Sequence, residues 1–134
     1  MSQDNVETLR RSNAAFNRRD HEAGLADYHE DIEWRDLKPA PDSPERLTGI
    51  AAVSEYWNLW LDAFGEITAE IEEYTDAGDH VVAVTHWQAR GEGSGIVTDL
   101  HTADVYEFAD GKIVAATIGY PDKAAALKAV GLAE

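Results

Sequence analysis

The spacing of hydrophobic and polar positions changes along the chain from a helical period to a strand-like one. Apolar residues recur every three or four positions over residues 4–18 and again over residues 50–64, which predicts two amphipathic helices. Further along, apolar and polar positions alternate as they do in half-buried strands. The alternating segments are residues 67–74, 81–90, 98–108 and 113–120.

Residues that favour caps and turns separate these segments. Asp20 and Asp122 each precede a short apolar segment, and an aspartate in that position can cap a short helix. Residues 32–35 alternate like a strand, and residues 38–49 hold three of the four prolines, which indicates a loop. Asp110-Gly111 favours a tight two-residue hairpin. Helices followed by a run of antiparallel strands predict an α+β fold, with a curved sheet wrapped over the helices.

The register of the last strands decides which side chains face the helices. If the turn at Asp110-Gly111 is tight and the preceding hairpin is centred near Gly95, His86 lies opposite Asp104. Asp104 and Tyr106 then share the inner face with His86, although a single bulge would reverse such an assignment. A buried carboxylate without a partner is costly. Asp104 is therefore either a hydrogen-bonded structural group or an acid or base with a shifted pKa in a ligand cavity.

The outer face of the predicted sheet is also apolar. Its members in the predicted register are Trp87, Val105, Val114 and Ile118. Monomeric proteins seldom expose a continuous surface of this kind. The pattern therefore predicts a homodimer that forms through the sheet.

The charge of the chain narrows its possible partners. A formal net charge of −15 and a pI near 4.5 oppose binding to phosphate backbones and anionic lipid, so neither nucleic acid nor membrane is expected as a partner. No apolar run approaches the roughly 20 residues of a membrane span, and we expect a cytoplasmic protein. The chain has no cysteine, and its five histidines form no close ligand pair along the sequence. We therefore expect neither a metal nor another cofactor.

Large aromatic residues on the first strand and the middle helix have two interpretations. Trp34, Tyr56 and Trp60, together with Tyr106, either form plain core or line a pocket for an apolar ligand. Trp34 and Trp60 are the better pocket candidates, because an indole N–H needs a partner and tryptophan tends to lie at cavity walls.

Five segments, taken in their order and spacing, resemble the nuclear transport factor 2-like superfamily and specifically its SnoaL-like branch. They are AAFNRRD (14–20), YHEDIEWRD (28–36), LTGIAAVSEYW (47–57), DVYEFADGKI (104–113) and YPDKAAALKAVGL (120–132). The resemblance covers nearly the whole chain and implies a single domain over residues 1–134. It also implies a cone-shaped curved antiparallel sheet around the N-terminal and middle helices, with an internal pocket and often a dimer.

The resemblance leaves two functional hypotheses, since the same fold hosts isomerases, cyclases, hydrolases and non-catalytic modules. Asp104 is similar to the acid/base aspartate of SnoaL-type cyclases and to the protonated oxyanion-hole aspartate of ketosteroid isomerases. Asp36 is similar to the base of those isomerases, whose oxyanion tyrosine aligns near Ser12. One hypothesis is cofactor-free acid–base catalysis on an apolar carbonyl or epoxide compound, with Asp104, Asp36 and His86 as catalytic residues. The other is a non-catalytic ligand-binding or dimerisation module.

Overall fold

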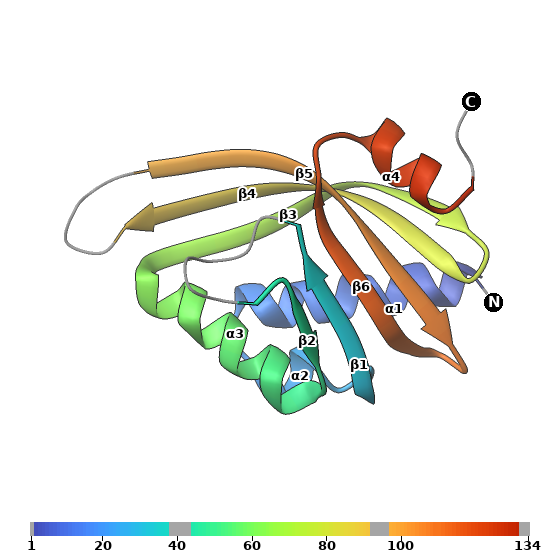
Figure 1. Ribbon diagram of the computed structural model, residues 1–134. Coiled ribbons are helices and arrows are strands. Elements are labelled where there is room, and N and C mark those ends of the chain that lie inside the picture. Colours follow the sequence, from blue (N-terminus) through green and yellow to red (C-terminus); the bar gives the residue numbers. More distant parts are fainter. Residues whose placement is uncertain (1, 38–43, 92–96, 132–134) are drawn as a thin grey trace.

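The computed structural model describes residues 2–37, 44–91 and 97–131, which form four helices and six strands (Figure 1). The helices are α1 (Ser2–Asn17), α2 (His21–Gly24), α3 (Ile50–Ala63) and α4 (Lys123–Ala129). The strands are β1 (Tyr28–Asp36), β2 (Arg46–Thr48), β3 (Phe64–Ala77), β4 (His80–Gly91), β5 (Val97–Ala109) and β6 (Lys112–Tyr120).

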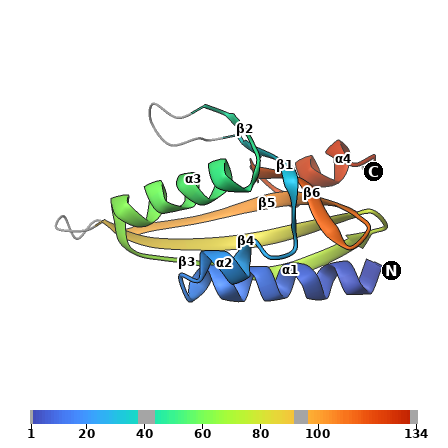
Figure 2. The same ribbon diagram turned by 90° about the horizontal axis from the view of Figure 1, so that it is seen from below.

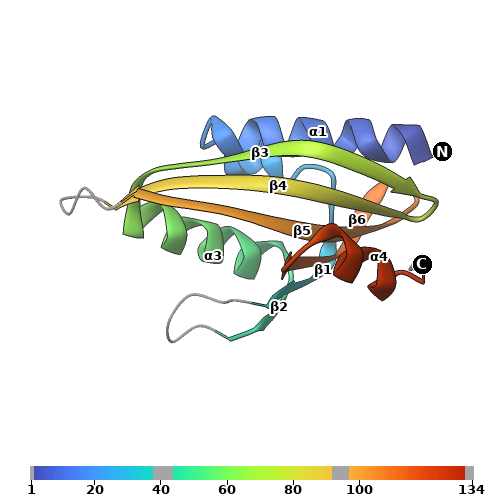
Figure 3. The same ribbon diagram turned by 90° about the horizontal axis from the view of Figure 1, so that it is seen from above.

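The strands form one curved, unclosed sheet in the order β2-β1-β6-β5-β4-β3, in which only β1 and β6 run parallel. Helices α1, α2 and α3 lie under the inner face, and α4 lies over the outer face (Figures 1 and 2). Seen from above in Figure 3, α1 lies along β3 and α3 lies on the side of β5, so the two helices stand under opposite edges of the long strands. The predicted α+β arrangement is confirmed. Among the described helices, none combines the length and the hydropathy needed to cross a membrane.

The predicted caps and the predicted tight turn are present. Asp20 accepts a hydrogen bond from the Ala23 N–H, and Asp122 accepts one from the Ala125 N–H. Asp110-Gly111 has φ values of 51° and 79°, as a type I′ turn requires. The predicted loop differs in part, because β2 pairs with β1 within it, while residues 38–43 lie outside the described residues.

Two hydrophobic clusters hold the sheet between the helices. The larger lies between the inner sheet face and helices α1 and α3. It includes Leu9, Ile32, Val53, Trp57 and Ile113, each less than a tenth exposed. The smaller lies on the outer face, where Val82, Ala103 and Val105 pack against Ala126 of α4. Both faces of the sheet are thus partly covered.

The predicted register between β4 and β5 is wrong. His86 lies opposite His101, and Asp104 lies opposite Ala83. His86 therefore pairs three residues earlier than expected, and an odd displacement exchanges the two faces of a strand. The hairpin loop on which the prediction depended falls largely on residues 92–96, outside the described residues. As a result His86 faces outward, whereas Asp104 and Tyr106 face inward as expected.

The predicted membership of the apolar outer face, which suggested a homodimer, also needs correction. Trp87 and Ile118 face the interior, because of the same register change on β4 and a bulge between β5 and β6. Val105 is covered by α4, and Val114 is half-buried. The outer face is therefore less apolar than the sequence pattern indicated.

Candidate functional site

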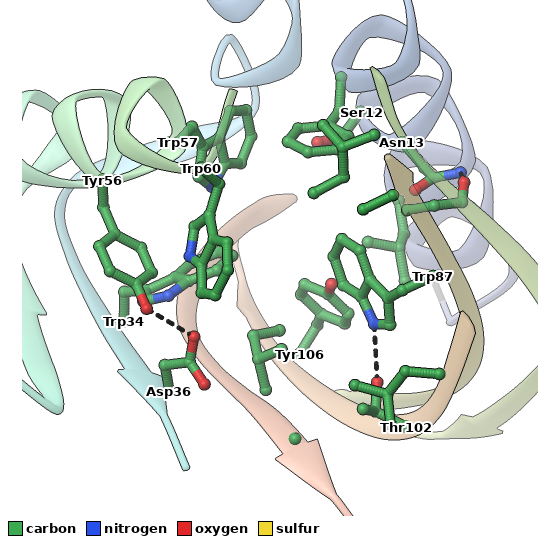
Figure 4. A pocket seen from close by; sticks show the side chains of 18 of the residues that line it. Ser12, Asn13, Trp34, Asp36, Tyr56, Trp57, Trp60, Trp87, Thr102 and Tyr106 are labelled. Carbon is green, nitrogen blue, oxygen red and sulfur yellow. Dashed lines mark hydrogen bonds between the residues drawn. The ribbon is translucent and has the colours of Figure 1, made fainter. Parts of the chain in front are cut away.

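A cavity of about 210 Å³ lies between the inner sheet face and helices α1 and α3 (Figure 4). This volume is somewhat below the roughly 300–1,000 Å³ of sites for drug-sized ligands, so the cavity suits a smaller molecule. All four tryptophans of the chain line it, namely Trp34, Trp57, Trp60 and Trp87. Tyr56 and Tyr106 line it too, so the four predicted ligand-binding residues are brought together.

Ring contacts fix the shape of the aromatic wall. Trp57 meets Phe16 and Trp34 edge to face, with ring centroids 5.1 and 6.0 Å apart. Trp60 stacks on Phe64 at 5.9 Å. Such contacts add to the free energy gained from burial and hold the rings in defined orientations. The contacts among these rings therefore define an apolar wall.

One end of the cavity is polar. Strand alternation places Trp34 and Asp36, two residues apart on β1, on the same inner face, and both line the cavity. The Tyr56 hydroxyl of α3 donates a hydrogen bond of 2.8 Å to Oδ2 of Asp36 (Figure 4). Asp36 is only 8% exposed, so this carboxylate stands against an otherwise apolar space. Within the described part of the chain, the buried Trp34 Nε1 has no hydrogen-bond partner.

Tyr28 and Tyr106 add two buried phenols to the lining. Ser12 Oγ donates a hydrogen bond of 2.7 Å to the Gly24 carbonyl and also lies beside the Tyr28 phenol. Burial raises the pKa of Tyr28 and of Tyr106, so both hydroxyls keep their protons at neutral pH. From the sequence, we placed Tyr28 on the short helix after Asp20 and did not include it among the site residues. Tyr28 instead begins β1, and a register shift separates it from the alternating residues 32–36.

Asp104 lies behind the cavity wall rather than in it. It is fully buried and accepts hydrogen bonds from Thr85 Oγ1 at 2.7 Å, Thr102 Oγ1 at 3.0 Å and the Gly119 N–H at 3.0 Å. Thr102 in turn accepts a hydrogen bond of 2.9 Å from Trp87 Nε1. The carboxylate therefore ties β4, β5 and β6 together and reaches the cavity only through Thr102 and Trp87.

Burial raises the pKa of Asp104 to about 6, even though the three hydrogen bonds act in the opposite direction. The negative charge of Asp36 adds a smaller upward contribution. Asp104 thus faces inward as expected, and the direction of its pKa agrees with the expectation. The expected pairing with His86 is wrong, because the ring of that residue lies on the other side of the sheet.

The three proposed catalytic residues consequently occupy three different places. Asp36 lines the cavity, Asp104 supports its wall, and His86 lies on the outer face, where its ring stacks on His101 with centroids 4.2 Å apart. Of the three, the structure leaves only Asp36 in position to touch a molecule in the cavity.

Comparison with known families agrees with this geometry. The model of the SnoaL-like domain matches residues 9–116. The chain belongs to the SnoaL-like domain family. Among curated proteins the sequence has no match.

Solved structures with the nuclear transport factor 2-like fold are similar over nearly the whole chain. TerC, co-crystallised with polyporic acid, is 23% identical, with a TM-score of 0.77, and the match covers 96% of this chain and 98% of TerC. Bal32a, from a soil-derived mobile gene cassette, is 21% identical, with a TM-score of 0.81 and coverage of 92% and 94%. RV0760c from Mycobacterium tuberculosis, in complex with estradiol-17beta-hemisuccinate, is 16% identical, with a TM-score of 0.74 and coverage of 86% and 92%. At these identities the similarity establishes the fold.

The Asp104 network predicts a specific dependence of stability on pH. A folded pKa of about 6 against the ordinary 3.8 means that the native state binds the proton more tightly than the unfolded state. This contribution to the free energy of unfolding is complete below about pH 3.8 and is lost as the pH rises through about 6, by about 3 kcal/mol in total. Asp104→Asn should therefore be more stable than wild type at pH 7.5, and the difference should shrink toward pH 4. Urea unfolding at both pH values measures it.

The matched control for this experiment is Asp110→Asn, which removes an exposed carboxylate from the turn after the same strand. This variant should differ from wild type by the same small amount at both pH values. A difference between Asp104→Asn and wild type that does not change with pH would contradict the raised pKa of Asp104.

Proposed function

We propose that the cavity binds a small, mainly apolar molecule that carries a carbonyl or similar oxygen, and that Asp36 exchanges a proton with this molecule without a cofactor. The observation that carries the proposal is the Asp36–Tyr56 pair at 2.8 Å in the wall of an otherwise aromatic cavity. A carboxylate beside apolar surface is the kind of group that serves as a general base in such sites.

The shape of the lining supports an apolar, flat ligand. Four indole rings, Phe16 and Phe64 line the cavity, and aromatic walls favour ring-bearing molecules. Leu100 is the exposed member of the lining, at 39%, and it marks the side from which a ligand enters. TerC and RV0760c of the same fold hold polyporic acid and estradiol-17beta-hemisuccinate respectively, which supports small-molecule binding in a cone of this kind.

The proton transfer uses groups that the cavity already contains. The Asp36 carboxylate takes a proton from the carbon next to the ligand carbonyl, and the electron pair of the broken C–H bond forms the enolate. The negative charge that develops on the oxygen is stabilised by a neutral hydrogen-bond donor, for which the phenol of Tyr106 is available. Return of the proton to carbon completes an isomerisation or an exchange.

One observation favours a binding protein without catalysis as the second candidate. Tyr56 already occupies one oxygen of Asp36, and Asp104 and His86 are outside the cavity lining. In this second candidate, the Asp36 carboxylate orients the ligand and takes no proton from it. The proton-exchange experiment below separates the two candidates.

We also propose that two copies of the chain associate through the part of the outer face that α4 leaves uncovered. Val84 on β4 and Val114 on β6 are half-buried and supply the apolar contact. Light scattering at micromolar concentration should give about twice 14.7 kDa for the wild type. Val84→Lys should give the monomer mass with an unchanged circular dichroism spectrum, because it places a charge in the contact. A wild-type mass of 14.7 kDa would contradict the association.

Ligand binding can be followed through the tryptophans, because all four line the cavity. We expect 2-acetylnaphthalene, an apolar aromatic ketone, to quench the intrinsic fluorescence in a saturable manner. Ala89→Leu adds three carbons to a residue that lines the cavity and should weaken the affinity about tenfold or more, since the added volume takes the place of the ligand.

Ala115→Leu is the control for this titration, because Ala115 is half-buried on β6 and does not line the cavity. It should leave the affinity unchanged. Equal affinities of wild type and Ala89→Leu would show that the ketone binds elsewhere.

Proton transfer is tested without knowing the natural reaction. In D₂O, the protein should accelerate exchange of the methyl protons of 2-acetylnaphthalene, as followed by proton NMR. Asp36→Asn should lower the catalysed rate about 100-fold or more, since it removes the base, while binding by fluorescence stays within about threefold because the shape of the cavity is kept.

Tyr56→Phe is the companion variant for the exchange experiment. It keeps the ring and removes only the hydroxyl that holds Asp36, so it should retain part of the exchange rate while leaving the affinity for the ketone within about threefold of wild type. Saturable binding with no exchange above the rate in buffer would establish the binding protein and refute Asp36 as a base.

A further inference from the structure

Three side chains that can bind a metal ion meet on the outer face of the sheet, away from the cavity. They come from neighbouring strands, with Glu72 on β3, His86 on β4 and His101 on β5. One ligand atom from each lies within 4.8 Å of the others. His86 and His101 are direct partners in the β4–β5 ladder, and their rings are stacked with an interplanar angle of 4°.

A β-bulge brings Glu72 to this place. Ile71 pairs with Thr85 and Glu73 pairs with Val84, so Glu72 is the extra residue of the bulge. Bulges redirect side chains in this manner. The Glu72 carboxylate lies 3.1 Å from Nε2 of His101 and 3.8 Å from Nδ1 of His86. It thus faces one nitrogen of each ring.

Asp99 supplies a second and independent observation. Its Oδ1 lies 2.6 Å from Nε2 of His86, so this nitrogen carries the proton and donates it to the carboxylate. The lone pair of the neutral ring is then on Nδ1, the nitrogen that faces Glu72. Histidines that bind metal ions usually donate their other N–H to a carboxylate in this manner.

We propose that Glu72, His86 and His101 bind a divalent late first-row transition metal ion of the Zn²⁺ type, with Asp99 as a positioning residue. Two imidazoles and one carboxylate are a common ligand set for such ions, whereas Mg²⁺ and Ca²⁺ prefer oxygen ligands alone. Bonds of about 2.0–2.1 Å in a tetrahedral site place ligand atoms roughly 3.3 Å apart. The His101–Glu72 pair, at 3.1 Å, already has this spacing.

The remaining contraction is small. The other ligand atoms lie within 4.8 Å of one another, and rotation of the exposed Glu72 and His101 side chains can close the difference. The net charge of −15 attracts cations to the chain. The sequence led to the expectation of no metal because the two histidines are not close neighbours along the chain, and only strand pairing brings them together.

The test is a titration of the untagged protein with ZnCl₂, measured by isothermal titration calorimetry. We expect saturable binding of one ion per chain. Glu72→Gln and His101→Gln should each weaken the affinity about tenfold or more, and Asp99→Asn should weaken it by about 10- to 100-fold with the stoichiometry unchanged. Glu72, Asp99 and His101 do not line the cavity. Quenching by 2-acetylnaphthalene therefore serves as the check that each variant is folded.

The matched control is His80→Gln. His80 lies on β4, as His86 does. It also lies beside a carboxylate, at 3.7 Å from Glu107, but it is outside the proposed ligand set. Its loss should leave zinc binding unchanged. Nuclear magnetic resonance of the histidine rings should show zinc-dependent shifts at Nδ1 of His86 and Nε2 of His101.

Several results would overturn the proposal. They are the absence of saturable binding, half an ion per chain, equal losses of affinity in His80→Gln and His101→Gln, or ring shifts confined to histidines other than His86 and His101.

Discussion

The pairing of β4 with β5 is the constraint on which both the cavity wall and the outer-face cluster of Glu72, His86 and His101 depend. Each strand residue can reach only one of the two faces, and the observed register places Trp87, Thr102 and Asp104 inside and His86 and His101 outside. The cavity wall and the outer-face cluster are therefore two results of one ladder. Displacing β5 by one residue would turn the Asp104 carboxylate to the outer face and the His101 imidazole to the inner face.

The buried carboxylate of Asp104 secures this arrangement at a cost. Removing the charge from water is unfavourable, and the raised pKa of Asp104 records that cost. In return, its three hydrogen bonds fix the relative positions of β4, β5 and β6, and the link through Thr102 holds the Trp87 ring against the cavity. A neutral apolar residue in this place would supply none of these directional contacts. The network thus trades stability at neutral pH for a defined cavity wall.

Much of the fold could be predicted from the sequence, because the deciding signals are local. Helical spacing, the capping aspartates and the Asp110-Gly111 turn each act over a few residues, and the structure confirms them. The aromatic lining was also foreseeable, since large apolar rings on one face of a helix are normally buried against the sheet. The orientation of Asp104 followed from its alternation with Tyr106.

The errors arose where the answer depends on contacts between distant segments. The β4–β5 register depends on the length of a hairpin loop, and Glu72 reaches the histidines only because of a bulge. Neither feature has a distinct residue pattern in this chain. The functional picture changed accordingly. The structure places His86 outside the cavity lining and Tyr28 within it. It also brings His86 and His101, which are not close along the sequence, into direct contact.

The one parallel pair in the sheet has a consequence for how the chain reaches this state. β1 lies against β6, so that Tyr28 is opposite Ile113 and Asp36 is opposite Ile118, and the two partners are separated by most of the molecule. A contact between such distant segments forms late, because a long loop must close before it gains any free energy. During synthesis, one edge of β1 stays unpaired until β6 has left the ribosome. The strand that carries the candidate base is therefore among the last parts to become ordered.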